Sequence, residues 1–262
     1  MADTLLAHIT LAPLTLDGVI AFAKGYGLNF SFLKSAYERD MWLEGFRTTL
    51  VLIAVTIPVS LAGGILLAGC LTAKSRLLSL PARLFVELTR NTPTLVQLVC
   101  AFLGLNMLIS DALGGAGRNP FGAFFWVVTV VGLHGAAYHA EALRAGIEAV
   151  PDTMREAARS LGFGRLEILR WVELPMALRI ALPAIFNNLV NIVKLTTVAS
   201  AVAVGEITYA SIMIWTQRDI VVELMIVLLL FFSAINLALS QVGFWLERRL
   251  RTPGLGPAGL GL

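Results

Sequence analysis

Five long apolar runs follow one another along the chain, separated by shorter segments that carry most of its charge. A run of about 20 apolar residues is long enough to cross the hydrocarbon core of a bilayer as one α-helix. The second run is interrupted by a polar stretch that contains a proline. The expected fold class is an all-α integral membrane protein with five transmembrane helices. The predicted spans lie at about 46–73, 80–109, 121–146, 177–204 and 221–246.

The two ends of the chain differ from this pattern. Residues 1–42 mix short apolar runs with glycine and charge, which is typical of a segment that lies at the membrane interface. Residues 251–262 are rich in glycine, proline and leucine, and we expect them to form a disordered tail. The transmembrane domain is predicted to occupy residues 43–250 and to include a charged loop at 150–175.

The composition agrees with a membrane location. Charged residues make up 14% of the 262 and hydrophobic residues 57%, with a mean hydropathy of +0.80. Ordinary soluble domains carry about 25% charged residues, so neither a soluble enzyme nor a nucleic-acid-binding protein is expected. Cys70 and Cys100 lie inside apolar runs, and we interpret them as buried small apolar residues rather than as a disulfide.

Lysine and arginine are concentrated in alternate connections between the spans. Three lie between the first two spans, four in the charged loop and three after the last span. The other two connections hold one arginine each, Arg118 and Arg218. Because cytoplasmic loops are enriched in lysine and arginine, this asymmetry predicts an N-terminus outside and a C-terminus in the cytoplasm. The charged loop would then lie at the cytoplasmic face.

The charged loop carries the signals of a short helix. Thr153 and Glu156 fit the capping-box pattern, in which a glutamate follows the capping threonine after three residues. Gly162 fits the left-handed position that ends many helices. A helix of about two turns is marginal in water, so it needs a surface to pack against. Leu161 and Phe163 supply an apolar tip, and two interpretations stay open: a docking element, or a loop that folds back on its own protein.

The same loop resembles a known motif, the EAA loop in the membrane subunits of bacterial binding-protein-dependent ABC importers. Its positions here are Glu156, Ala157, Ala158, Gly162, Leu174 and Pro175. Val172 stands where isoleucine is usual, which is a mild departure. The stretches 89–98, 135–147 and 181–207 resemble the polar amino acid permeases of that family. The resemblance covers about residues 43–250.

The resemblance implies a type I ABC importer permease fold and a set of partners. In that family the loop forms a coupling helix, which sits in a groove of an ATPase subunit. The coupling residues would be Glu156, Ala157, Ala158, Leu161, Gly162 and Phe163. The expected partners are an ATPase dimer that holds ATP and Mg, an identical or homologous permease subunit, an extracytoplasmic amino acid-binding protein and membrane lipid. This chain has no G-x-x-x-x-G-K-[ST] phosphate loop, so the cofactors would be bound by the separate ATPase.

Polar and charged residues also lie inside the predicted spans. Arg90 lies about ten residues into the second span, or roughly 15 Å deep by helix rise. Interhelical hydrogen bonding is one interpretation, favoured for the asparagines. A water-accessible cavity is the other, favoured for the charged residues, because a charge inside the membrane needs a partner or water. Two helical faces carry such residues at i, i+4 and i+7: His134, Tyr138 and Glu141 on the third span, and Asn187, Asn191 and Lys194 on the fourth.

The resemblance and these stripes together predict a substrate path. Arg90 offers a planar fork suited to the carboxylate of an amino acid, and Glu141 offers an acid for its ammonium group. The helix break before the second half of the span is expected to expose free backbone groups, with side-chain donors beside it. The expected path residues are Arg90, Thr92, Pro93, Gln97, Tyr138, Glu141, Lys194, Leu195 and Thr196.

Two of these positions bear on which amino acid is carried. Leu195 stands where the family has an acid, which favours a neutral or acidic substrate over a strongly basic one. Lys194 is interpreted either as a ligand of the substrate or as the ion-pair partner of Glu141. The second possibility would leave Glu141 less free to bind substrate.

Two other classes of protein stay as alternatives. An intramembrane enzyme would require a catalytic pair at membrane depth, for which His134 and Glu141 are the pair available. A secondary transporter would require an inverted repeat, which five spans with one charged loop do not offer. His134 and His139 are five residues apart and no HExxH motif is present, so neither a metal site nor a catalytic residue is assigned.

Overall fold

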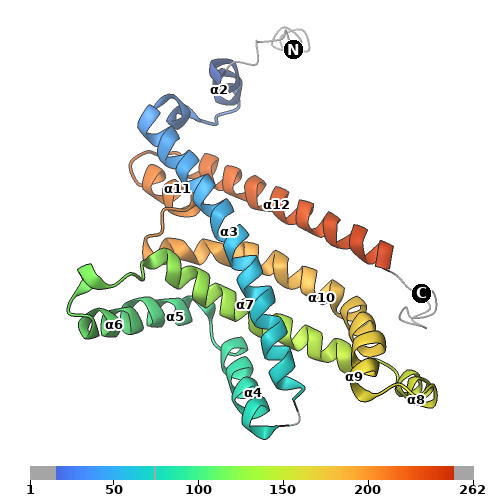
Figure 1. Cartoon of the computed structure of the whole chain (residues 1–262). Helices are drawn as coiled ribbons and strands as arrows, with labels where there is room; N and C mark the ends of the chain where they lie inside the picture. The colour runs from blue at the N-terminus through green and yellow to red at the C-terminus, as the bar shows by residue number, and fades with distance from the viewer. Residues whose placement is uncertain (1–15, 74, 251–262) are drawn as a thin grey trace, which may run out of the picture.

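A computed structural model describes residues 16–73 and 75–250, and every regular element in these ranges is a helix (Figure 1). The expected tail at 251–262 lies outside the described residues, as do residues 1–15. η1, η3 and η5 are 3-10 helices, and η2 and η4 are π-helical. In chain order the elements are α2 (Leu16–Gly25), η1 (Ser31–Lys34), α3 (Ala36–Leu71), α4 (Arg76–Arg90), α5 (Thr94–Val99), η2 (Cys100–Leu105), α6 (Asn106–Ala112), η3 (Ala116–Arg118), α7 (Ala123–Glu148), α8 (Asp152–Ser160), α9 (Arg165–Ile168), η4 (Leu169–Glu173), α10 (Leu174–Leu195), η5 (Thr196–Val202), α11 (Ile207–Trp215) and α12 (Val221–Leu250).

Five helical segments in the described part of the chain are long and apolar enough to cross a membrane. The predicted five-span, all-α fold class is therefore confirmed. The first segment begins at Ala36, so the domain boundary expected at residue 43 falls inside α3 rather than at a helix end. The segments are Ala36–Leu71, Thr94–Ala112, Ala123–Glu148, Arg165–Val202 and Val221–Leu250.

The second span is shorter than predicted because α4 is a separate helix. Figure 1 shows α4 leaving the line of α5 and α6 at a steep angle. Pro93 has no backbone N–H, so a helix that ran through it would leave a carbonyl without its partner. The apolar residues of α4 also share the helix with three arginines and a glutamate. This mixture is typical of a helix at the membrane surface rather than of a span.

α3 and α7 pack closely along their length, and small residues make this approach possible. A Cβ atom added to Gly64 would lie 2.5 Å from the Cβ atom of His139. One added to Gly63 would lie 2.9 Å from the Cβ atom of Ala136. Contacts this short admit glycine and no larger residue, which is the usual device for bringing membrane helices together. Gly63 and Gly64 therefore serve the packing of α3 against α7.

The start of α3 is tied to the connection between α11 and α12. Nε of Arg218 donates a hydrogen bond to the buried carboxylate of Glu38. The carboxylate of Glu223 accepts a bond of 2.7 Å from the backbone N–H of Asn29. These contacts hold the segment around η1 onto the transmembrane helices. The buried apolar side chains beneath it are Phe32, Ile214, Ile220 and Leu224.

Glu206 is a buried acid that was not singled out from the sequence. It lies at the start of α11, where its carboxylate accepts bonds of 2.9 and 2.8 Å from the backbone N–H groups of Thr208 and Tyr209. The free N–H groups at a helix start favour an acid at this position. Gly45 of α3 packs against the same turn, where an added Cβ would lie 2.9 Å from that of Ala210. α11 is therefore fastened directly to α3.

Candidate functional site

The break between α4 and α5 is closed by the side chain of Gln97. Because Pro93 has no backbone N–H, the carbonyl of Thr89 loses the partner that a continuous helix would provide. Nε2 of Gln97 donates instead, at 2.8 Å to the carbonyl of Thr89 and at 3.0 Å to that of Thr92. The Thr92 hydroxyl donates to the carbonyl of Leu88 at 2.6 Å. The prediction of free backbone groups at this break is therefore wrong, because side chains satisfy the carbonyls.

Arg90 at the end of α4 lies beside Tyr138 and Glu141, which share one face of α7. The guanidinium carbon of Arg90 lies 5.3 Å from the centre of the Tyr138 ring, a cation–π contact. Nη1 of Arg90 lies 3.9 Å from Oε1 of Glu141. Arg90 is nevertheless the last residue of α4 and precedes the second span, which begins at Thr94. Its predicted position roughly 15 Å inside that span is wrong, since the depth was counted along a helix that ends at Arg90.

Glu141 has a closer partner, Arg144, which was not anticipated from the sequence. Nε of Arg144 donates to Oε2 of Glu141 at 3.0 Å, and Nη2 donates to Oε1 at 2.5 Å. Nη1 of Arg144 donates to Oε1 of Glu148 at 2.5 Å. The signal that could have revealed this network is the spacing on α7: Glu141 precedes Arg144 by three residues, and Glu148 follows it by four. Both oxygens of Glu141 are thus engaged by its own helix.

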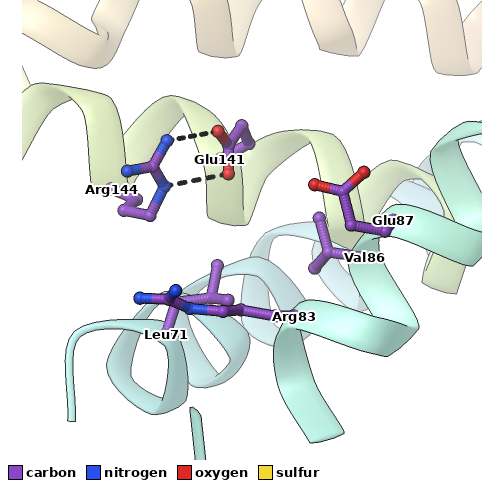
Figure 2. Close-up of a pocket in the computed structure, with 6 residues that line it drawn as sticks. All are labelled: Leu71, Arg83, Val86, Glu87, Glu141 and Arg144. Atoms are coloured by element: carbon purple, nitrogen blue, oxygen red, sulfur yellow. Dashed lines mark hydrogen bonds and ion pairs between the residues drawn. The ribbon is translucent and has the colours of Figure 1, made fainter. Parts of the chain in front are cut away.

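Glu141 and Arg144 border a pocket that lies between α4, α7 and the C-terminal end of α3. Its volume is about 230 Å³. Figure 2 shows the Glu141–Arg144 pair on one side and the α4 residues Arg83 and Glu87 on the other. The two α4 residues were missed because α4 was assigned to a span, so its polar face was not expected to meet α7. The residues that line the pocket are Leu71, Arg83, Val86, Glu87, Glu141 and Arg144.

The pair that an intramembrane enzyme would need is not formed. His134 is buried, and one of its ring nitrogens lies 3.1 Å from the hydroxyl of Thr94 on α5. The carboxylate of Glu141 is held by Arg144. Within residues 16–73 and 75–250 no hydrogen bond joins His134 to Glu141. His134 is therefore a contact between α5 and α7, of the kind that joins membrane helices.

Lys194, Leu195 and Thr196 lie at the junction of α10 and η5. The Lys194 side chain is exposed, and among the described residues the ion-pair partners of Glu141 are two arginines. The suggested pair between Lys194 and Glu141 is therefore wrong. Thr196 is buried, and its hydroxyl donates to a backbone carbonyl one turn earlier at 2.8 Å. The predicted path residues thus come from two places, one on α4, α5 and α7 and the other at the end of α10.

The charged loop forms the short helix α8, whose start differs from the prediction. Pro151 is the residue before the helix, with φ −60° and ψ 137°, and no side chain caps the helix start. Thr153 lies inside the first turn, so its predicted capping box with Glu156 is wrong. The reason is the proline, whose fixed φ sets the entry into the helix before the threonine is reached.

The end of α8 has the predicted left-handed glycine. Gly162 has φ +86°, in the region that favours glycine. Its N–H donates to the carbonyl of Arg159 at 2.9 Å, and the N–H of Phe163 donates to that of Ala158 at 3.1 Å. These two bonds form a Schellman motif, which ends the helix and turns the chain. Leu161 is 77% exposed and Phe163 41%, so the turn presents an apolar tip.

Arg155 ties α8 to two transmembrane segments. Nη2 of Arg155 donates to the carbonyl of Ile147 at the end of α7 at 2.9 Å, and Nε donates to Oε1 of Glu173 at 2.6 Å. Nη1 donates to Oδ1 of Asp152 at 2.6 Å. Hydrogen bonds to Asp152 and then Glu173 raise the pKa of Arg155. The base of the loop therefore folds back on its own protein, while its tip is left exposed.

Comparison with known sequences identifies the class of protein to which this arrangement belongs. The family described as "Binding-protein-dependent transport system inner membrane component" matches residues 60–252. The chain belongs to this family and is an inner-membrane component of an importer.

Several relatives are amino acid permeases rather than enzymes. The glutamine transport system permease protein GlnP of Escherichia coli is 30% identical over 80% of this chain and 92% of its own length. The probable amino-acid ABC transporter permease protein PatM of Vibrio harveyi is 30% identical over 86% of this chain and 97% of its own. The arginine transport system permease protein ArtQ of Bacillus subtilis is 26% identical over 86% of this chain and 99% of its own length.

Solved structures share the fold. The crystal structure of an amino acid ABC transporter with histidines matches with a TM-score of 0.73 and 28% identity, over 85% of this chain and 100% of that chain. The inward-facing MetNI methionine ABC transporter matches with a TM-score of 0.62 and 19% identity, over 83% of this chain and 100% of that chain. The predicted type I ABC importer permease fold is therefore confirmed.

Proposed function

We propose that the chain is the translocation subunit of an ATP-driven importer of polar amino acids, and that α8 couples it to a separate ATPase. The permeases for glutamine and arginine among its relatives support this class of substrate. The observation that carries the proposal is the geometry of α8. This short helix is bonded to both α7 and η4 through Arg155 and ends in an exposed apolar tip.

In this proposal the residues of α8 have different tasks. Leu161 and Phe163 form the tip that enters a groove of the ATPase, and Gly162 sets the direction of that tip. Glu156 and Ala157 are exposed and face the partner, whereas Ala158 is buried and packs the helix on its own chain. ATP and Mg are bound by the ATPase dimer. Its motion reaches α7 and α10 through the hydrogen bonds of Arg155.

The orientation in the membrane is part of the proposal. The alternation of arginine-rich and arginine-poor connections supports an N-terminus outside, with α8 and the C-terminus in the cytoplasm. Reporter fusions test this directly. We expect reporters at residues 115 and 213 to lie outside, and reporters at residue 160 and the C-terminus to lie inside. A cytoplasmic reporter at residue 115 would contradict the five-span topology.

The substrate path of the proposal runs between this subunit and a second, identical or homologous permease. Arg90, beside Tyr138, supplies a cation for the substrate carboxylate, and Lys194 and Thr196 supply polar groups at the end of α10. Because Glu141 is already held by Arg144, it is a weak site for a basic side chain. We therefore propose a neutral or acidic amino acid, delivered by an extracytoplasmic binding protein.

The test is reconstitution in proteoliposomes with the partner ATPase and the extracytoplasmic binding protein. We expect ATP-dependent uptake of a polar amino acid such as glutamine or glutamate. The ATPase activity should rise when the loaded binding protein is added. No uptake and no stimulation with any common amino acid would overturn the proposal.

A further inference from the structure

The pocket between α3, α4 and α7 contains two opposite charges that remain largely unpaired. Arg83 has no hydrogen bond or ion pair within the described ranges. Glu87 has one side-chain contact there, a hydrogen bond of 3.3 Å from Nδ2 of Asn91. Arg83 and Glu87 are four residues apart on α4. The basic residue comes first, and this order gives a weaker i, i+4 ion pair than an acid followed by a base. Figure 2 shows the Arg83 side chain extending towards Leu71 and the Glu87 carboxylate pointing towards α7, so the two charged groups lie apart.

The other charges at the pocket balance one another. Arg144 is bonded to both Glu141 and Glu148, and Arg90 also lies beside Glu141. Two cations and two anions are therefore accounted for within the chain. Among the described residues that line the pocket, the charges left without an ion pair are those of Arg83 and Glu87. The pocket thus presents a separated pair of opposite charges with no net charge, which is complementary to a zwitterion.

The size of the pocket limits the ligand to a small molecule. Its volume of about 230 Å³ lies below the roughly 300–1,000 Å³ of sites for drug-sized ligands. Leu71 and Val86 give it an apolar wall between the charged groups. A small aliphatic side chain can lie against that wall while the carboxylate and ammonium groups of its α-carbon face Arg83 and Glu87.

We infer that this pocket binds a free α-amino acid as a zwitterion, with its carboxylate at Arg83 and its ammonium group at Glu87. Figure 2 shows the guanidinium of Arg144 across the pocket from that of Arg83, with both groups at the same end of the pocket. Arg144 donates one bond from Nη1 and one from Nη2 to glutamates, so each nitrogen keeps an N–H for the carboxylate. Recognition then uses the backbone groups that all amino acids share.

This site rests on the proposed function, because the proposed orientation puts the pocket at the cytoplasmic side, where the imported amino acid arrives. It is separate from the predicted substrate path except at Glu141, which contributes to the wall through its pair with Arg144. A bound amino acid would join α4 to α7. The last turn of α7 carries Glu148 and the Ile147 carbonyl that Arg155 holds.

The experiment uses the permease–ATPase complex in lipid nanodiscs without the binding protein. L-alanine is the probe, and its binding is measured by saturation-transfer NMR. Propionate and ethylamine, which each carry one of its two charges, are the ligand controls. We expect Arg83→Gln and Glu87→Gln each to weaken alanine binding about tenfold, the effect of losing one charge-assisted contact. Arg83→Lys should keep most of the binding, because the cation remains.

Arg76→Gln is the matched control. It removes an exposed arginine from the same helix, outside the pocket, and should leave alanine binding unchanged. Equal binding of alanine by wild type, Arg83→Gln and Glu87→Gln would overturn the inference, as would propionate or ethylamine binding as tightly as alanine. Uptake in proteoliposomes is measured separately. Normal uptake without alanine binding would overturn the pocket alone, whereas alanine binding without uptake of any amino acid would overturn the proposed function.

Discussion

α7 makes two kinds of contact that differ in their chemistry. Along its length it packs against α3 through small residues, and an added Cβ at Gly64 would lie 2.5 Å from that of His139. Towards its C-terminal end it meets α4 and α8 through charged groups, with Glu141 beside Arg90 and the Ile147 carbonyl bonded to Arg155. The first contact has no room for an extra methyl group. The second adds hydrogen bonds and ion pairs, which solvent can replace, to the packing of Ala82 and Val86 against α7.

The difference indicates which parts of the molecule can move. A close-packed interface tolerates little displacement, since its contacts are lost together. Ion pairs that are partly exposed contribute about 0–1 kcal/mol each and are exchanged more easily. The α3–α7 contact is therefore the fixed frame, with α4 packed on it through Ala82 and Val86, and the charged end of α7 is where α8 can change position. Substitutions in the two regions should have different consequences.

The largest effect is expected for Gly64→Val in the frame. The added side chain would overlap His139 on α7, and overpacking of this kind typically costs about 1–3 kcal/mol or more. We expect little monodisperse protein and a lowered Tm in detergent. Gly69→Val is the matched control, because an added Cβ at Gly69 on the same helix has nothing within 4 Å. Equal thermal stability of the two variants would show that the α3–α7 contact is not tight.

Gly162→Val should preserve the fold and remove coupling. A β-branched residue in the left-handed region costs roughly 1 kcal/mol or more, and the strain would redirect Phe163. We expect normal membrane insertion, reduced uptake, and an ATPase activity that no longer responds to the loaded binding protein. Gly164→Val is the control, since Gly164 has φ −70° and tolerates a side chain. If ATPase stimulation in Gly162→Val matched wild type, α8 would not be the transmission element.

Arg155→Gln should weaken the coupling between ATP hydrolysis and uptake less than Gly162→Val does. The substitution leaves Glu173, whose side chain is 19% exposed, without its cation, at a cost of about 1–3 kcal/mol. α8 keeps its tip but loses its bonds to α7 and η4. We expect more ATP to be hydrolysed for each amino acid taken up. Glu173→Gln combined with Arg155→Gln should be no worse than Arg155→Gln alone, and additive losses would show that the two residues act independently.

Arg90→Lys is expected to have the smallest effect. It keeps the cation near Glu141 but loses the planar fork that lies over Tyr138. We expect uptake to fall by a few-fold, with a changed preference among amino acids, as measured in proteoliposomes. Arg76→Lys serves as the control on the same helix. Wild-type uptake and preference in Arg90→Lys would make Arg90 a structural arginine and put the substrate path elsewhere.

Local features of the sequence predicted the fold better than the contacts of the site. The five spans follow from hydropathy, and the left-handed Gly162 follows from residues within one turn of it. Helical spacing placed Tyr138 and Glu141 on one face of α7, but the depth predicted for Arg90 was wrong. That error arose because the end of α4 depends on Pro93. Arg144 was missed because a partner on the same helix competes with the partners expected from other helices.

The side chain of Gln97 bridges the junction of α4 and α5, because it donates hydrogen bonds to the carbonyls of Thr89 and Thr92. A proline kinks or breaks a helix. Here the side-chain amide of Gln97 links the two helices that follow one another at the break. Its two hydrogen bonds are worth about 1 kcal/mol each. Rotation of this one side chain would therefore loosen the link between α4 and α5, and the hold of α4 beside the pocket would then rest on the packing of Ala82 and Val86 against α7.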